Sequence, residues 1–280
     1  MIISNSELTT YRLCPRWHYY AFVKNLEPNE PNEAISIGLL GHLILEVYYK
    51  AIFNGKDFSL ARDAALAILK DKIVNSLLEN TTNEKITYLL KNMEFYFSYY
   101  GREDFEPLNV EEIFTYTDPY GTTWACRPDL IIKDKYGDLS LIDHKFTYDF
   151  FSESKEKFTS QLAIYKIILR NNGIHINNII LNQIRYRYIK NSGASNIFRR
   201  SSLKYSPAEI DNIWRENNAI IPLLVNNGKK ALRTWNDLAC RWCPFQVPCI
   251  EEVKENNVNW LGMGFKPRQY GYQLYDPKGL

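Results

Sequence analysis

Apolar residues recur at helical spacing through most of the first hundred positions of the chain. A capping box at 4–7 predicts that a helix begins there and continues through 8–23. Apolar residues three or four positions apart predict a second helix over 35–53. The stretch 60–100 contains neither Gly nor Pro and predicts two further helices, separated near 81–83. We therefore expect the N-terminal third to be helical.

The pattern changes to short β-rich runs after Pro107. Three runs, 110–116, 123–132 and 139–147, have strand character. The loop 134–138, which joins the last two, has turn chemistry. Strands joined by short turns pair antiparallel, so these runs predict an antiparallel meander.

Helical spacing returns over 154–171, and Asn-Gly directly after it marks the end of that helix. The run 178–190 then predicts another strand. Ser, Pro and Glu at the start of 206–225 have the order of a helix N-terminus and predict a helix there. The segment 257–280 is rich in Gly, Tyr and Pro without a period, and we expect it to be irregular.

Two aspartates lie beside the predicted hairpin strands. If those strands pair, Asp129 and Asp143 reach the same end of the sheet, and their oxygens suit Mg²⁺ or Mn²⁺. Lys145 is two residues after Asp143 and shares its face, whereas His144 faces the other way and is expected to be structural. Metal-assisted hydrolysis of a phosphodiester fits this set. Asp-x-Lys alone is also common as a solvated pair, but the apolar residues that flank it here favour a site.

The two aspartate segments, Pro128-Asp129 and Asp143-His144-Lys145, resemble the signature of the PD-(D/E)XK nuclease superfamily. The resemblance implies an α/β (α+β) fold, with a restriction-endonuclease-like core of a small mixed sheet flanked by helices. It also implies a helical N-terminal part and a C-terminal cysteine loop that closes onto the core.

Two further motifs are similar to the RecB-like branch of this superfamily. They are Gln161-x-x-x-Tyr165 on a predicted helix and Gly-His at His42. The resemblance implies that His42, Asp129 and Asp143 are metal ligands and that Lys145 is the catalytic lysine. It also implies that Gln161 and Tyr165 are substrate-side or site-ordering groups. Glu111 or Glu112 is a further candidate for the metal shell.

Four of the five cysteines form a one-plus-three pattern. Cys240, Cys243 and Cys249 fall in one compact segment, predicted to be a loop, and Cys14 is the natural fourth ligand. In a reducing compartment such thiols are more often metal ligands than disulfides, and both Zn²⁺ and an iron–sulfur cluster accept four of them. We interpret Cys126 as a small core residue.

The one-plus-three pattern resembles iron–sulfur nucleases of the RecB-like class, such as AddB-type subunits and CRISPR-associated exonucleases. The segment that begins Cys14-Pro15 and the dipeptide Cys243-Pro244 carry the match. The resemblance implies a [4Fe–4S] cluster, which would join the two ends of the chain.

The net charge of +2 and pI near 8.1 neither demand nor exclude nucleic acid as a partner. A local patch would have to bind it. Arg185 and Arg187 alternate onto one strand face and are candidates for phosphate contacts, although a solvated strand edge explains them equally well. The sequence lacks an uninterrupted apolar run of about 20 residues and a secretory leader, so we expect a cytoplasmic protein, encoded by a cell or a virus.

The sequence thus predicts a metal-dependent DNA exonuclease that acts on single-stranded ends, with 5′ to 3′ polarity favoured and with a helicase, recombination or CRISPR protein as a partner. The alternative is a non-catalytic iron–sulfur or zinc DNA-binding protein on the same fold. The predicted organisation is one integrated nuclease domain. It consists of a helical region over 1–106, a nuclease core over 107–205, a helix with the cysteine segment over 206–256 and a tail over 257–280.

Overall fold

A computed structural model of the protein describes residues 2–30, 32–68, 83–101, 103–157, 159–187 and 193–268. The chain forms two compact units. We call residues 1–30, 115–126 and 208–280 the terminal unit, and residues 31–114 and 127–207 the sheet unit. The domain boundaries expected from the sequence remain a prediction.

The sheet unit is built on a five-stranded sheet with the order β3-β6-β7-β8-β9. Its strands are β3 (Phe105–Val110), β6 (Leu130–Asp134), β7 (Leu139–Thr147), β8 (Asn178–Arg185) and β9 (Phe198–Leu203). β7 and β8 run parallel, and the remaining neighbours are antiparallel. This mixed sheet with helices confirms the predicted fold class. β6 and β7 form the predicted hairpin, but most of the run 110–116 and the start of the run 123–132 lie outside this sheet, so the predicted three-stranded meander is wrong.

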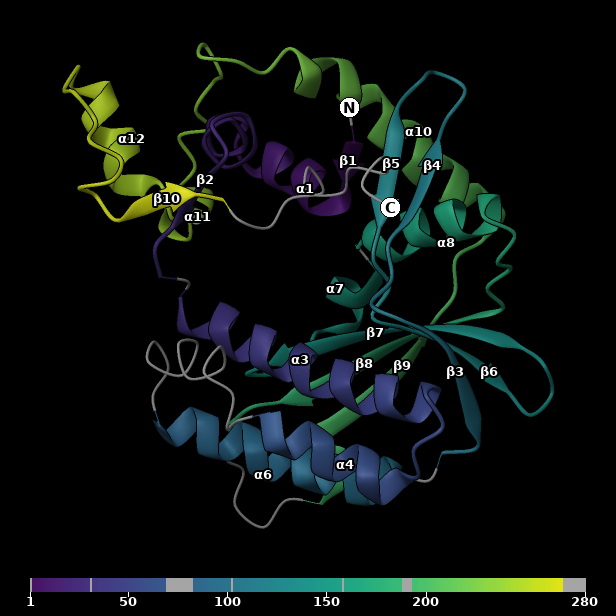
Figure 1. The fold of residues 1–280 in the computed structure, drawn as a ribbon. Coiled ribbons are helices and arrows are strands. Elements are labelled where there is room, and N and C mark those ends of the chain that lie inside the picture. Colours follow the sequence, from purple (N-terminus) through teal and green to yellow (C-terminus); the bar gives the residue numbers. More distant parts are fainter. Residues whose placement is uncertain are drawn as a thin grey trace. The chain divides into compact units, whose positions relative to one another are not determined.

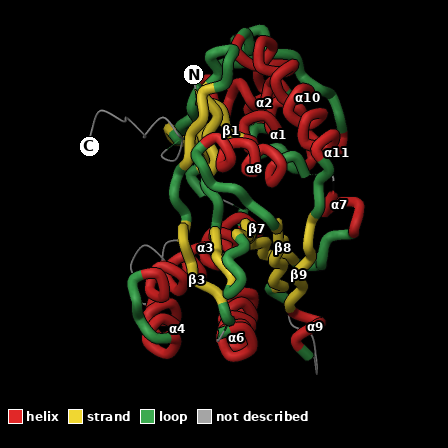
Figure 2. Tube along the Cα trace, turned by 90° about the vertical axis from the view of Figure 1, so that its right-hand side faces the viewer, coloured by secondary structure: helices red, strands yellow, loops and turns green. Residues whose placement is uncertain are grey.

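Helices cover the sheet on both sides (Figures 1 and 2). On one side lie α3 (Glu33–Phe53), α4 (Phe58–Ala67) and α6 (Asn83–Tyr100), whose apolar residues form the main core with the strands. On the other side lies α8 (Gln161–Asn171), preceded by the short α7 (Glu153–Lys157).

Among the described helices, α3 alone has the length and composition to span a membrane. Half of its apolar window is buried in the protein, as expected for the central helix of a folded core, so this is weak evidence for a membrane span.

The terminal unit begins with β1 (Ile2–Ser4), which pairs in parallel with β5 (Thr123–Cys126) in a sheet of order β1-β5-β4, where β4 is Phe114–Thr117. A second small sheet joins β2 (Leu26–Pro28) to β10 (Phe265–Pro267), so the segment after residue 257 is not wholly irregular. The helices of this unit are α1 (Asn5–Leu13), α2 (Pro15–His18), the π-helix η1 (Tyr19–Val23), α10 (Pro207–Val225), α11 (Asp237–Arg241) and α12 (Gln246–Val253).

The first predicted helix is interrupted at Cys14. The Ser4 hydroxyl accepts a hydrogen bond from the Glu7 amide at 3.2 Å, which confirms the predicted N-terminus. Cys14 is extended (φ −163°, ψ 115°) because the ring of Pro15 disfavours helical geometry in the residue before it. The break sets Cys14 between two helices.

Two of the predicted strands are each divided between different sheets. The run 110–116 breaks at Glu111, whose φ of +56° places it in the left-handed region. The run 123–132 breaks at Pro128, which cannot donate to a sheet ladder. In both places the chain leaves one sheet for another, and period-two patterning does not reveal such a change.

Other boundaries differ in smaller ways. The predicted helix 154–171 is two helices, α7 and α8, and the strand predicted over 178–190 ends at Arg185, with 188–190 outside the described residues. The predicted break near 81–83 lies almost wholly outside them too, as does the end of the tail, 269–280. The sequence did not predict β1, β9 or α9 (Ala194–Ile197).

Candidate active site and metal centre

The β6–β7 hairpin brings the two aspartates together. Its register pairs Leu130 with Ile142, so Asp129, directly before β6, and Asp143, directly after Ile142, meet at the same end of the sheet. Asp143 is buried and Asp129 is mostly buried, with 3% and 13% of their side chains exposed. The backbone register therefore fixes this pair of carboxylates.

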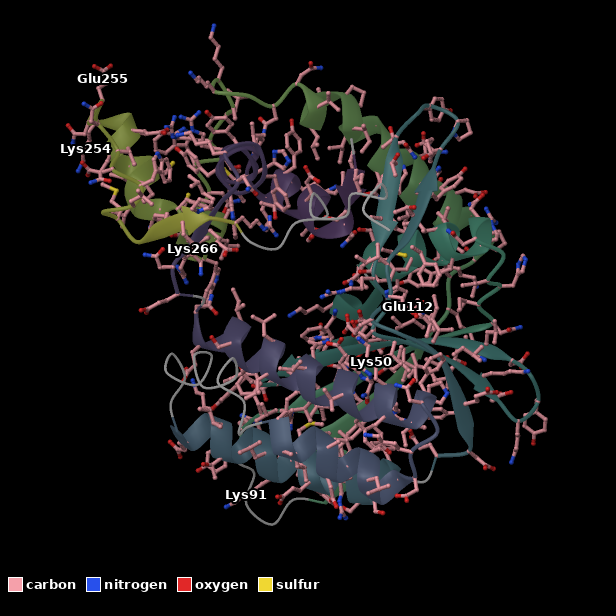
Figure 3. The ribbon with its side chains drawn as sticks, viewed as in Figure 1. Lys50, Lys91, Glu112, Lys254, Glu255 and Lys266 are labelled. Atoms are coloured by element: carbon pink, nitrogen blue, oxygen red, sulfur yellow. The ribbon has the colours of Figure 1, made fainter. Side chains whose placement is uncertain are left out.

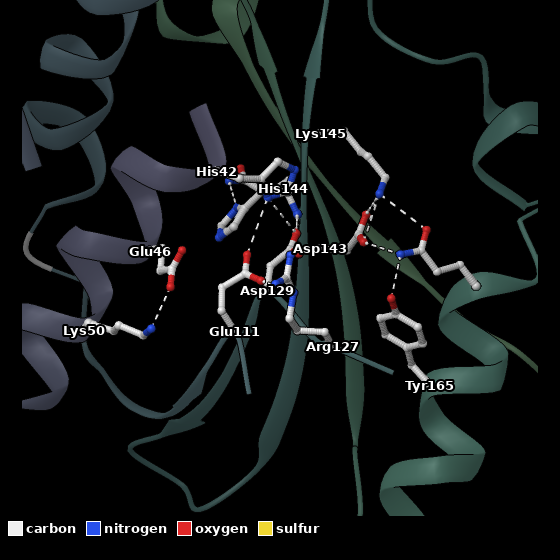
Figure 4. A network of polar contacts seen from close by, with 12 residues as sticks. His42, Glu46, Lys50, Glu111, Arg127, Asp129, Asp143, His144, Lys145 and Tyr165 are labelled. Atoms are coloured by element: carbon white, nitrogen blue, oxygen red, sulfur yellow. Dashed lines mark hydrogen bonds and ion pairs between the residues drawn. The ribbon is translucent and has the colours of Figure 1, made fainter. Parts of the chain in front are cut away.

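Lys145 lies against Asp143 on the shared face of β7. Its Nζ is 2.8 Å from Asp143 Oδ2 and donates to Oδ1 at 3.0 Å (Figure 4). Burial alone would lower the pKa of Lys145, but Asp143 and Asp129 raise it above its usual value. The strand thus holds a charged ammonium beside the carboxylates.

The N-terminus of α8 adds a side-chain amide to this group. Gln161 Nε2 donates to the hydroxyl of Tyr165 one turn later at 3.1 Å and to Asp143 Oδ1 at 3.4 Å. Its Oε1 accepts from Lys145 Nζ at 3.5 Å. Gln161 and Tyr165 therefore lie within the same network as the catalytic candidates (Figure 4).

His42 approaches from α3 on the side of Asp129. Its Nδ1 is 3.6 Å from Asp129 Oδ2 and 3.7 Å from Glu111 Oε1. The approach depends on Gly41, because a Cβ there would be 2.4 Å from the ring of Phe146. A glycine is the one residue that lets α3 pack this closely on β7.

Glu111 is the third member of a compact group of ligand atoms. Atoms of His42, Glu111 and Asp129 all lie within 4.8 Å of one another. Glu111 directly follows β3 and has a left-handed backbone conformation. Its other carboxylate oxygen, Oε2, is 2.9 Å from Arg127 Nε. The sequence left open whether Glu111 or Glu112 joins the metal shell; the Glu112 carboxylate instead accepts a hydrogen bond from the Asn109 side-chain amide.

The charges of the group fit a divalent cation. Burial raises the pKa of Asp129 to about 7, with Asp143 and Glu111 adding to the effect against His42 and Lys145. Partial burial lowers the pKa of His42, but Asp129 and Glu111 raise it above the usual value. Clustered carboxylate oxygens and an imidazole nitrogen are ligands for Mg²⁺ and Mn²⁺. A bound cation would relieve this crowding of carboxylates.

His144 faces away from the site, as predicted. Its Nδ1 is 2.8 Å from Asn182 Nδ2, and its ring stacks on Tyr49. Burial lowers its pKa well below the usual value. Its side chain is therefore a neutral packing group on the opposite face of β7 from Asp143 and Lys145. Its backbone N–H donates to Asp129 Oδ2 at 2.6 Å.

The cysteines lie in the terminal unit. Cys240 and Cys249 are in α11 and α12, and Cys243 lies between them, so two short helices replace the predicted loop. Burial, together with the nearby Cys14, Cys249 and Cys240, raises the pKa of Cys243 to about 12. The four thiols therefore share one neighbourhood. Across the described residues, no three cysteine sulfurs lie within 4.8 Å of one another.

The fifth cysteine, Cys126, is fully buried in β5. It is a small residue in a sheet, as its strand context predicted.

The two arginines suggested for phosphate contacts are engaged by one acid. Asp149 is 3.4 Å from Arg185 NH2 and 2.6 Å from Arg187 NH2. Arg185 also lies over the ring of Phe150. These contacts use part of the charge, and a role for the pair in nucleic-acid binding stays a prediction.

A mixed sheet that presents carboxylates, a lysine and a histidine at one end is suited to metal-assisted hydrolysis of phosphodiesters. Residues 2–250 match the family model of the PD-(D/E)XK nuclease superfamily, and the chain belongs to this superfamily. It is therefore a nuclease of a family that uses divalent metals.

Among curated proteins, none matches the chain in sequence. Three solved structures are similar at low identity. SSO0001 is 16% identical, with 89% of this chain and 85% of that chain covered and a TM-score of 0.39. A protein from Eubacterium rectale, named provisionally as an exonuclease, is 12% identical over 86% and 88%, with a TM-score of 0.48. LHK-Exo in complex with dAMP is 13% identical over 65% and 91%, with a TM-score of 0.28. These likenesses are too remote to carry a functional conclusion.

Proposed function

We propose that the protein is a metal-dependent DNA exonuclease that hydrolyses phosphodiester bonds from single-stranded ends, with 5′ to 3′ polarity favoured. The observation that carries the proposal is the contact of the partly exposed Lys145 with the buried Asp143, beside the ligand group of His42, Glu111 and Asp129. A lysine next to several carboxylates is an arrangement suited to chemistry on an anionic phosphate.

His42, Glu111 and Asp129 would hold the cation, and Asp143 would complete the acidic side of the site. A bound Mg²⁺ or Mn²⁺ would supply Lewis acidity and lower the pKa of a coordinated water. Lys145 keeps its proton because of Asp143 and Asp129, so its ammonium orients the water nucleophile and offsets charge that develops on the phosphate. Asp143 accepts from Lys145 and thereby fixes the direction of that ammonium.

Gln161 is proposed to order the catalytic pair. Its amide bridges Asp143 and Tyr165, and its oxygen faces Lys145, so it restrains three groups at once. Tyr165 has about 8% of its surface exposed, which suits support of Gln161 better than contact with a base.

For the cysteines we propose a [4Fe–4S] cluster on Cys14, Cys240, Cys243 and Cys249. Four thiolates suit either Zn²⁺ or an iron–sulfur cluster, and Cys14, Cys240 and Cys249 lie near Cys243. The one-plus-three pattern along the chain, which resembles that of iron–sulfur nucleases, favours the cluster. An absorption band near about 400 nm after anaerobic purification tests this assignment against zinc.

The decisive test of activity is digestion of end-labelled single-stranded DNA with Mg²⁺ or Mn²⁺, with wild type beside Asp143→Ala. Placing the label at the 5′ or the 3′ end gives the polarity, and a circular single strand detects endonuclease cleavage. RNA of the same sequence tests the sugar preference. Equal digestion by both proteins, or none by wild type with either metal, would favour a non-catalytic DNA-binding protein on this fold.

A further inference from the structure

Positively charged side chains also gather in a pocket away from the candidate active site. A pocket of about 470 Å³ in the terminal unit is lined by Arg16, Lys229, Lys230, Arg233 and Trp235, among others. Four cations gather here in a chain whose net charge is only +2. None of these residues belongs to the sheet unit, where the catalytic candidates lie.

The wall of the pocket is fastened to the segment around Cys14. We call residues 226–236 the basic loop. The Leu232 carbonyl accepts from the Arg16 amide at 3.0 Å, and the Lys229 carbonyl accepts from the Arg16 guanidinium. Thr234 Oγ1 donates to the Leu13 carbonyl at 2.9 Å. These bonds fix the basic loop in place before any ligand binds, which lowers the entropic cost of binding.

The cations of the pocket are of two kinds. Arg16 and Arg233 are mostly buried and both contact Glu252, and Arg233 Nε also donates to Cys249 Sγ at 3.2 Å. Lys229 and Lys230 are exposed, and within the described part of the chain neither has a carboxylate at ion-pair distance. One carboxylate thus serves the two arginines and leaves the two lysines available to an anion.

Trp235 is held at the surface beside these lysines. Its side chain is 72% exposed, and its backbone is in the left-handed region with φ +51°. A bulky residue seldom adopts that conformation, and an exposed indole has no stabilising role in a folded core. Cations next to an exposed aromatic face are the two elements that bind single-stranded nucleic acid, through phosphates and through base stacking.

We infer that this pocket binds single-stranded nucleic acid, with Lys229 and Lys230 on backbone phosphates and a base stacked on Trp235. The inference rests on the proposed nuclease function for the class of ligand, and it adds a binding site outside the catalytic group. Arg16 and Arg233 position the basic loop and link it to the cysteine segment. A free phosphate would use the cations and leave the indole without a partner, and an acidic protein segment would do the same.

The test measures binding without cleavage. Full-length protein, purified anaerobically, is titrated into a fluorescently labelled oligothymidine of about 12 nucleotides in EDTA, and anisotropy is recorded over a range of salt concentrations. Lys229→Ala/Lys230→Ala should weaken binding roughly 10-fold at low salt and reduce the salt slope by about 1.4, since each lost phosphate contact on a single strand contributes about 0.7. Trp235→Ala should weaken binding roughly 5-fold or more and leave the slope unchanged.

Matched controls are an exposed lysine pair and an exposed aromatic residue elsewhere. Lys91→Ala/Lys254→Ala removes the same charge from positions that do not line the pocket (Figure 3), and Tyr120→Ala removes a side chain that is 83% exposed. Both should bind within about twofold of wild type. Thermal unfolding confirms that each variant is folded.

Three results would overturn the inference: pocket variants that bind like wild type, controls that lose as much affinity, or a poly-glutamate peptide that displaces the protein more effectively than oligothymidine does. The outcome separates from that of the nuclease proposal. Normal binding by the pocket variants with cleavage by wild type contradicts the pocket alone. Pocket-dependent binding by a wild type that cleaves nothing with Mg²⁺ or Mn²⁺ contradicts the nuclease proposal alone.

Discussion

The two candidate metal sites of this protein are built in opposite ways. In the sheet unit, Asp129, Asp143 and Lys145 come from one hairpin, and strand register brings them together. In the terminal unit, Cys14 is more than two hundred positions away from Cys240 along the chain, and side-chain and loop contacts bring these segments together. A site fixed by register can lose its chemistry while the fold persists, whereas a site that joins distant segments supports the fold itself.

The largest effect should follow from Asp143→Asn. The amide keeps the shape of the side chain but removes the negative charge that orients the Lys145 ammonium and raises its pKa. We therefore expect a loss of roughly 10³-fold in the cleavage rate. Because the backbone register is untouched, the melting temperature should change by only a few degrees. Single-turnover cleavage and thermal unfolding measured on the same preparation check both halves. A variant that unfolds as it loses activity would contradict the contrast between the two sites.

The complementary change is Cys243→Ser. It should abolish the absorption band at roughly 400 nm. It should also destabilise the protein by about 3 kcal/mol or more, because the free energy of binding a cluster that joins distant segments contributes to folding. Cys126→Ala is the matched control, because Cys126 is buried in β5 and is not one of the four cysteines of the one-plus-three pattern. It should keep the absorption band. Retention of the band and of stability by Cys243→Ser would show that Cys243 is not a ligand, and absence of the band from the wild type would refute the cluster.

Gly41→Ala tests how tightly helix packing controls the carboxylate site. Its Cβ would lie 2.4 Å from Phe146, so α3 must shift and carry His42 away from Asp129. We expect about 1–3 kcal/mol of destabilisation and roughly tenfold weaker Mn²⁺ binding, measured by unfolding and by calorimetry.

The same helix supplies the control for that experiment. Gly38 has nothing within 4 Å of an added Cβ, so Gly38→Ala should raise stability by up to about 1 kcal/mol and leave Mn²⁺ binding unchanged. Phe146→Leu combined with Gly41→Ala should recover part of the lost affinity. Equal effects of the two glycine substitutions would show that space at Phe146 is not what matters.

The contrast between the sites also explains what the sequence could predict. Asp129, Asp143 and Lys145 were found from strand pairing, because local pattern sets register, and the helix that carries His42 was predicted within two residues of its start. Glu111 was only one of two open candidates, because its position depends on a left-handed backbone in a run that patterns as continuous strand. Tertiary context decides such a conformation, and side-chain periodicity does not encode it.

The basic loop was missed for a related reason. Lys229, Lys230 and Trp235 have no periodic spacing and no motif, and their charge is diluted in a chain of +2. They gather because the loop is fastened to Arg16, far away in sequence. Charge that is assembled by distant contacts leaves no local signal along the chain.

The smallest predicted effect concerns proton competition at the register-built site. Burial raises the pKa of Asp129 from 3.8 to about 7 in the metal-free protein, so the folded state binds a proton there that the unfolded state releases near pH 4. This contribution to stability is present below the unfolded pKa and is lost as the pH rises through about 7. The pKa of His42 is also raised, so its contribution changes in the same direction.

A metal ligand must release its proton, so the cation and the proton compete for Asp129. Because the pKa of Asp129 is about 7, Mn²⁺ affinity should rise by up to about tenfold per pH unit below that value and level off above it. The increase in melting temperature that Mn²⁺ causes should therefore be larger at about pH 8 than at about pH 6. Calorimetric titrations across this range measure the effect, with Asp129→Asn as the reference that lacks the carboxylate. Affinity that is flat over roughly one pH unit on either side of 7 would mean that Asp129 is already ionised there, and that burial and the neighbouring carboxylates do not raise its pKa into this range.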